Sequence, residues 1–108
     1  MLDNPEKTAR LLAALKTAVP FEVELEPLVV KQLQADKVAV ASRQIVSDLS
    51  YLGDEGGIMC HLSRSEETGR ALVVSLTHVR VPRSMPLAAA VLDYQKHRVK
   101  KLRKQAQG

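Results

Sequence analysis

Residues 44–62, QIVSDLSYLGDEGGIMCHL, hold two strand-like runs and the turn between them, and this stretch decides the fold. Residues 53–57, Gly-Asp-Glu-Gly-Gly, are the strongest turn signal in the chain. Before the turn, the pattern predicts a strand over residues 44–52 with Ile45, Leu49 and Tyr51 on one face. After it, alternate residues share a face, namely Ile58, Cys60 and Leu62. Together they predict an antiparallel hairpin.

A third apolar run follows the hairpin. After a polar loop over residues 63–70, Leu72, Val74 and Leu76 share a face, which extends the hairpin to a meander. The alternation then shifts to Val79 and Val81, as it would at a bulge or where the covered face changes. Pro82 ends the sheet. If the second hairpin turns near residues 66–67, Cys60 lies opposite residues 73–74 and His61 opposite Leu72.

The N-terminal third predicts two helices and a strand. Asn4 is a good N-cap and Pro5 suits the first helical position, so a helix is expected over Pro5–Ala18. Residues 21–26 alternate apolar and acidic side chains, which predicts a half-exposed strand with three glutamates outward. Pro27 opens either a short helix to Ala35 or an extended segment at residues 28–30. Residues 38–41 begin a strand or form a connector.

The last predicted element is a long helix after Met85-Pro86. At the helical period, one side of it collects the residues expected to dock, which are Ala88, Val91, Leu92, Gln95, Val99 and Leu102. Tyr94 and Arg98 lie at the margin of that side. We expect them either to form a polar seam with a partner or with the sheet edge, or to cover their stems and keep their polar tips in water.

These elements define the expected architecture. The fold class is α+β: an antiparallel sheet of three or four strands with an N-terminal helix and a long basic C-terminal helix, arranged as a two-layer sandwich. Residues 1–108 are expected to form a single domain, with residues 103–108 either continuing the helix or forming a disordered basic tail. This class of fold hosts many unrelated activities, so it selects no function by itself.

Charge and composition narrow the class of protein. Residues 1–60 contain six Lys and Arg against nine Asp and Glu, whereas residues 61–108 contain ten against three. Cys60 is the single cysteine, so no intramolecular disulfide can form, and a reducing compartment is favoured. No stretch approaches the ~20 apolar residues of a membrane span, and the first residues do not resemble a signal peptide. We therefore expect a cytoplasmic protein.

The candidate functional surface is the basic side of the last helix. Six cations fall within nine residues, and no acidic residue follows Asp93: Lys96, Arg98, Lys100, Lys101, Arg103 and Lys104. Closely spaced cations suit phosphate contacts, so nucleic acid, with structured RNA or the ribosome favoured, or another polyanion is the expected partner. Only three aromatic residues occur, outside any stacking motif, so a base-stacking platform is not expected. The alternative is that the cations serve the helix dipole and solubility.

No enzyme, cofactor or metal site is predicted. Asp54 and Glu55 supply only two carboxylates, too few for a hard cation, and residues 53–57 are explained as a turn that could also contact a ligand or partner. Cys60 and His61 are neighbours in a strand and point to opposite faces, so they are not expected to act as a catalytic pair. His78 is expected to be a sheet residue. Neither glycine pattern of nucleotide-binding loops is present.

The second function class is a protein-interaction or homodimeric adaptor domain. The closing helix is expected to reach beyond the sheet, because about 20 residues span ~30 Å and a six-residue strand only about 20 Å. The row Glu22, Glu24 and Glu26 is of opposite charge to that helix and could meet a copy of it in a second molecule. Two measurements distinguish the two classes, the salt dependence of binding and the stoichiometry of the complex. Nucleic-acid binding weakens as salt is added, whereas an apolar dimer interface persists.

Overall fold

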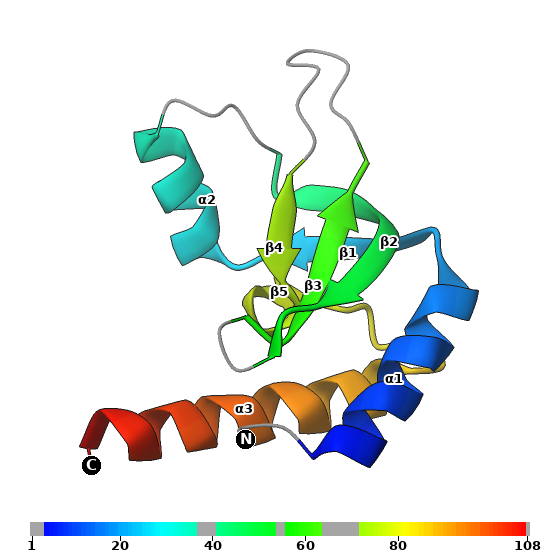
Figure 1. Cartoon of the computed structure of the whole chain (residues 1–108). Coiled ribbons are helices and arrows are strands. Elements are labelled where there is room, and N and C mark those ends of the chain that lie inside the picture. Colours follow the sequence, from blue (N-terminus) through cyan, green and yellow to red (C-terminus); the bar gives the residue numbers. More distant parts are fainter. Residues whose placement is uncertain (1–3, 37–40, 54–55, 64–71, 108) are drawn as a thin grey trace.

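The computed structural model describes residues 4–36, 41–53, 56–63 and 72–107, and it confirms the α+β class (Figure 1). Along the chain the elements are α1 (Pro5–Ala18), β1 (Phe21–Leu25), α2 (Pro27–Ala35), β2 (Arg43–Tyr51), β3 (Ile58–Leu62), β4 (Val73–Ser75), the 3-10 helix η2 (Leu76–His78), β5 (Val79–Arg80) and α3 (Ala88–Gln107). The strand or connector expected over residues 38–41 falls largely outside the described residues.

Both N-terminal helices form where local signals place them. The Asn4 side chain accepts a hydrogen bond from the Lys7 amide at 3.0 Å, and Pro5 starts α1. Thr8, Leu11 and Leu15 form the buried stripe of this helix. Of the two alternatives after Pro27, the helix is the one observed. Its partly buried residues Val29, Val30 and Leu33 pack against the core.

The sheet has five strands rather than three or four. All pairs are antiparallel, and the order is β4-β3-β2-β1-β5. The additional strand, β5, has two residues and pairs with β1 through Leu25 opposite Val79 and Glu24 opposite Arg80. A strand this short has no periodicity of its own. Only its long-range pairing defines it.

The sheet is curled because its two edge strands are consecutive in sequence. β4 and β5 stand at opposite ends of the strand order, yet only the three residues of η2 join them. Three residues span about 10 Å at most, so the two edges must come close together. The shift of alternation after Leu76 marks this one-turn crossing from one edge of the sheet to the other.

The hairpin of residues 44–62 forms, but a bulge changes which side chains of β2 face the core. Tyr51 pairs with Ile58 next to the turn, while the register shifts between Val46 and Asp48. Val46 and Leu49 are both buried as a result, and Ile45 is exposed. Placing Ile45 and Leu49 on one face was therefore wrong, because strict alternation does not allow for an inserted residue.

β3 and β4 follow the expected pattern closely. Ile58, Cys60 and Leu62 are buried, and Cys60 pairs with Val74. His61 pairs with Val73, one residue from its expected partner. His78, expected in a strand, lies exposed in η2.

The helices do not form one layer over a flat sheet. α1 and α3 lie together at one end of the curled sheet, whereas α2 stands well apart from α3 (Figure 1). The two-layer sandwich is therefore not the arrangement observed. The core lies inside the curl and beneath α1 and α3, where the side chains of five strands and two helices meet, among them Leu15, Leu25, Leu49, Ile58, Leu76 and Val91.

Candidate nucleic-acid interface

α3 has a docked side that starts at Val91 and ends at Arg98. Val91, Tyr94 and Arg98, spaced three and four residues apart, are buried against the sheet. The Tyr94 hydroxyl accepts a hydrogen bond from the Ile58 amide at 2.9 Å. Gly57, with φ of +67°, lies against both Tyr94 and Arg98, and a Cβ atom there would come within 2.9 Å of the Arg98 Cζ. The hairpin turn therefore fixes the middle of the helix.

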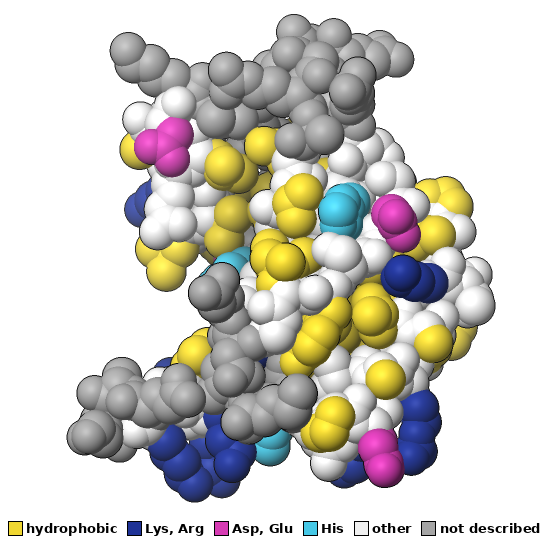
Figure 2. All heavy atoms as spheres, in the orientation of Figure 1, with side chains coloured by type: hydrophobic (Ala, Val, Ile, Leu, Met, Phe, Trp, Pro, Cys, Tyr) yellow, Lys and Arg dark blue, Asp and Glu magenta, His cyan; other side chains and the backbone are white. Residues whose placement is uncertain are grey.

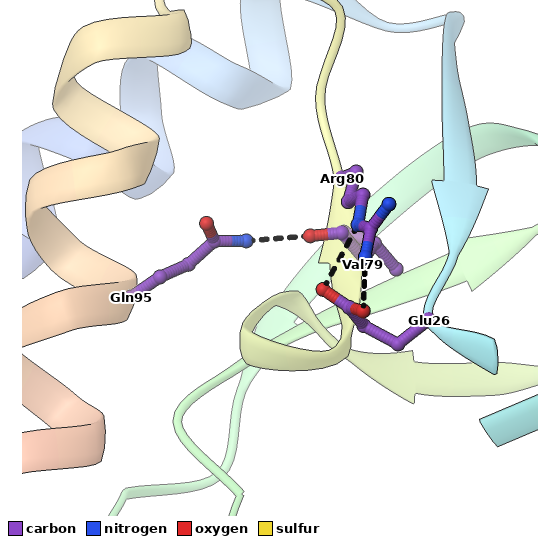
Figure 3. A network of polar contacts seen from close by, with 4 residues as sticks. All are labelled: Glu26, Val79, Arg80 and Gln95. Carbon is purple, nitrogen blue, oxygen red and sulfur yellow. Dashed lines mark hydrogen bonds and ion pairs between the residues drawn. The ribbon is translucent and has the colours of Figure 1, made fainter. Parts of the chain in front are cut away.

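Gln95 gives the docked side a second attachment. Its amide nitrogen donates to the carbonyl oxygens of Leu76 and Val79, both at 2.7 Å, and Figure 3 shows the bond to Val79. These carbonyls belong to η2 and β5, the segment that closes the sheet. The two attachments fix the rotation of α3 about its axis.

The rotation places five of the six predicted cations in water. The exposed residues, here called the basic face, are Lys96, Lys100, Lys101, Arg103 and Lys104. Figure 2 shows Lys and Arg side chains gathered along the C-terminal part of α3. Within the part of the chain that the structure describes, none of the five forms an ion pair. Like charges thus stand close together, and no described carboxylate pairs with them.

Arg98 is placed differently from the other five. It is only 2% exposed, so its guanidinium is not presented to solvent on the basic face. The sequence-based inclusion of Arg98 among the phosphate contacts does not fit this position. Its burial follows from the close approach of the Gly57 backbone, a long-range contact that no helical-wheel argument contains, and arginine is rarely a buried residue.

The docked side is rotated relative to the predicted apolar side. Leu92, Val99 and Leu102, which were expected to dock, are 49%, 39% and 41% exposed. From Val99 to Lys104 every residue of α3 is exposed, and this part of the helix projects beyond the body of the protein (Figure 1). Because the core contacts stop at Arg98, most of the basic face lies on this projection.

The acidic row on β1 is matched by arginines of the neighbouring strands. Glu26 and Arg80 form a two-point ion pair at 3.2 and 3.3 Å, visible in Figure 3, and Glu22 lies 3.8 Å from Arg43. Glu24 stands opposite both arginines in the register. The Arg80 guanidinium is thus paired with the Glu26 carboxylate, and it does not extend the basic face.

Cys60 has no features of a reactive thiol. Its side chain is buried, and this burial raises the pKa of the thiol from 9.0 to about 12. The thiol is therefore protonated at neutral pH, as expected of a structural cysteine.

A serine and a histidine lie close together on the outer face of the sheet, which the sequence reasoning did not anticipate. The Ser50 hydroxyl and His61 Nε2 are 2.7 Å apart across β2 and β3. Asp48 stands opposite His61, but its carboxylate accepts from the Leu49 amide at 2.8 Å. A nucleophile also needs a substrate cavity and oxyanion donors, and the groove between α1 and α3 includes neither residue. We treat the pair as a cross-strand contact.

A groove of about 760 Å³ lies between α1 and α3. It lies on the side of α3 that carries Ala90, Asp93 and His97, and α1 contributes residues from Asn4 to Ala14. Sequence reasoning missed it because it exists only where the two helices meet.

The described residues contain neither a metal-binding cluster nor a helix that could span a membrane. Among the described residues, no cluster of three or more His, Cys, Asp or Glu is arranged to hold a metal ion. Over the same residues, no helix is both long and apolar enough to cross a membrane.

Comparisons of the chain with protein-family models, with curated proteins and with solved structures found no match.

Proposed function

We propose that this domain binds structured nucleic acid, with RNA or the ribosome favoured, through the basic face of α3, and that it performs no catalysis. The observation that carries the proposal is the set of five exposed cations without an ion-pair partner in the described structure. Like charges one turn apart, such as Lys96, Lys100 and Lys104, cost a helix a few tenths of a kcal/mol per pair. A polyanion would convert this cost into favourable contacts.

The aromatic residues favour contacts with the backbone of a folded nucleic acid over base stacking. Phe21 and Tyr51 are half-buried against the core and Tyr94 is buried, so the three rings offer little exposed surface for base stacking. A straight helix with cations on its outer side suits the phosphate rows of a duplex or folded RNA, which are recognised through shape and backbone.

A protein-interaction or homodimer function is the second candidate. It is favoured by the exposed apolar side chains Leu92, Val99 and Leu102, which continue onto the projecting part of α3. Such an interface would persist at high salt, whereas phosphate binding would not. Sedimentation at low and high salt, with and without RNA, separates these candidates.

The decisive test is a matched pair of charge reversals assayed with an RNA hairpin over a salt series. Lys100→Glu with Lys104→Glu alters the basic face, and Lys16→Glu with Lys31→Glu alters exposed cations elsewhere. Both variants change the net charge of +4 by the same amount. We expect the first to weaken binding strongly and to reduce the salt slope by about two contacts, and the second to bind nearly as the parent. Equal binding by both variants, each shown to be folded, would reject the basic face as the site.

A further inference from the structure

The groove between α1 and α3 has a mixed lining that points to a particular class of ligand. Along α1 the lining changes from Asn4 and Lys7 to Leu11 and Ala14. Along α3 it changes from Leu87 and Ala90 to Asp93 and His97. Its volume of about 760 Å³ falls within the range of small-molecule sites, which is roughly 300–1,000 Å³.

Thr8 is the residue of this groove that packing alone does not explain. It lines the groove and is 5% exposed, so its hydroxyl has lost most of its contact with bulk water. In the described structure the Thr8 hydroxyl makes no hydrogen bond, whereas that of Thr17, on the same helix, donates to the Ala14 carbonyl at 2.7 Å. A buried polar group without a partner is destabilising. A ligand that supplies the missing partner would remove this cost.

The other polar groups decide between ligand classes. A hydrocarbon chain would leave the Thr8 hydroxyl unpaired. A simple anion could approach the cations Lys7 and Arg10, but it would leave the apolar part of the lining uncovered. Asn4 uses its side-chain oxygen to cap α1, which leaves its NH₂ group to donate, and His97 can donate or accept. Donors and acceptors beside apolar walls suit a flat heterocycle with a polar edge.

Cations lie at the groove and beside it, and they would attract a phosphate carried by such a ligand. Lys7 lines the groove, and Lys101 of the basic face follows His97 by one helical turn. The groove and the basic face are therefore neighbouring surfaces of α3.

We propose that this groove binds one nucleoside monophosphate unit, with the base between α1 and α3 and the phosphate toward Lys7 and Lys101. The unit is either a free nucleotide or an unpaired residue of a bound RNA. Only the second source rests on the proposed function. The groove would then add a nucleotide pocket to a surface that otherwise contacts backbone.

The first test titrates the ¹⁵N-labelled protein with the four ribonucleoside 5′-monophosphates at millimolar concentration. We expect saturable shifts at the amides of Thr8, Ala90 and His97 for at least one nucleotide. Thr8→Val should weaken this binding roughly five-fold, the value of one net hydrogen bond, whereas Thr17→Val should not. Thr8→Val should also raise the denaturation midpoint of the ligand-free protein, because it removes a buried unpaired hydroxyl.

A steric variant keeps the proposal falsifiable whatever Thr8→Val does to folding. Ala90 lines the groove, and its neighbour Ala89 is exposed outside it. Ala90→Leu should abolish the nucleotide-induced shifts, and Ala89→Leu should leave them unchanged. Shifts that survive Ala90→Leu would place the nucleotide elsewhere and overturn the proposal.

The source of the nucleotide is decided by comparing the affinities of two RNA hairpins. One has a single unpaired 3′ nucleotide and the other is blunt. A preference for the overhang that Ala90→Leu removes identifies RNA as the source. Monophosphate binding without such a preference identifies free nucleotide. Absence of both effects overturns the proposal. Failure of the basic face is distinguishable, since Lys100→Glu with Lys104→Glu would then leave hairpin binding intact.

Discussion

At the scale of single residues, Gly57 is where the hairpin turn and α3 hold each other in place. Gly57 and Gly53 both have positive φ angles, +67° and +66°, yet only Gly57 is packed against a neighbouring element, because a Cβ atom at Gly53 would have nothing within 4 Å. Gly53→Ala should therefore cost only the backbone term, about 1 kcal/mol, whereas Gly57→Ala should cost clearly more. Urea denaturation of the two variants measures the difference. Equal losses would mean that contact with α3 does not constrain the turn.

Cys60 gives a second residue-scale prediction, through pH. Its folded-state pKa of about 12 lies above the unfolded value near 9.0, so the unfolded chain releases this proton first as pH rises. The contribution of Cys60 to stability is complete below pH 9 and declines between about pH 9 and 12, where the thiol is ionised in the unfolded chain but not in the folded protein.

The measurement is the free energy of unfolding against pH for the wild type and for Cys60→Ala. Subtracting one curve from the other removes the titrations common to both, and the difference should narrow above pH 9. A constant difference would contradict the buried thiol. Thiol-labelling reagents at neutral pH should modify the native protein only as fast as it opens.

At the scale of elements, α3 has one side that packs against the protein and one that faces solvent. One arginine lies on each side, so substitutions of the two arginines test the two sides separately. Arg98 is buried and Arg103 is exposed. Arg98→Gln should lower the free energy of unfolding by a few kcal/mol, roughly 2–4, and leave the salt dependence of RNA binding unchanged. Arg103→Gln should change stability by less than about 0.5 kcal/mol and reduce the salt slope by about one contact. Exchanged effects would mean that the helix docks with the opposite side.

The basic face also makes a prediction for helix stability without any ligand. Lys100 has a lysine one turn away on each side, Lys96 and Lys104, and Glu at this position would turn two repulsions into two attractions. Lys100→Glu should therefore stabilise the free protein by up to about 1 kcal/mol at low salt, and the gain should shrink as salt is added. Thermal denaturation at two ionic strengths measures it. A loss of stability would show that the lysines are already neutralised in the free protein.

At the scale of the whole molecule, the elements with local signals were predictable and those defined by long-range contacts were not. α1 starts at Asn4-Pro5 as expected because its cap involves residues adjacent in sequence. β5 was missed because its two residues are a strand only through pairing with β1. The bulge after Val46 depends on the partner strand in the same way, and it exposes Ile45.

The same distinction between local signals and long-range contacts applies to the candidate surfaces. The basic face was predictable because clustered lysines on a helix remain exposed unless something covers them. The burial of Arg98 depends on Gly57, which is about 40 residues away in sequence, and the groove depends on the meeting of α1 with α3. Thr8 carried a usable signal, since it lies three residues before Leu11 and seven before Leu15, on the buried stripe of α1.

The projecting end of α3 has a consequence for the thermodynamics of binding. A disordered basic tail loses about 1–2 kcal/mol of backbone entropy per residue when it is ordered on a target. Here α3 is held at its middle by Tyr94, Gln95 and Arg98, and the helical segment after Arg98 carries most of the cations away from the body of the protein. Folding of the domain has already set the spacing between those charges. Association with a rigid phosphate array would therefore require little further ordering, and its rate should be set by electrostatic attraction between two preformed surfaces.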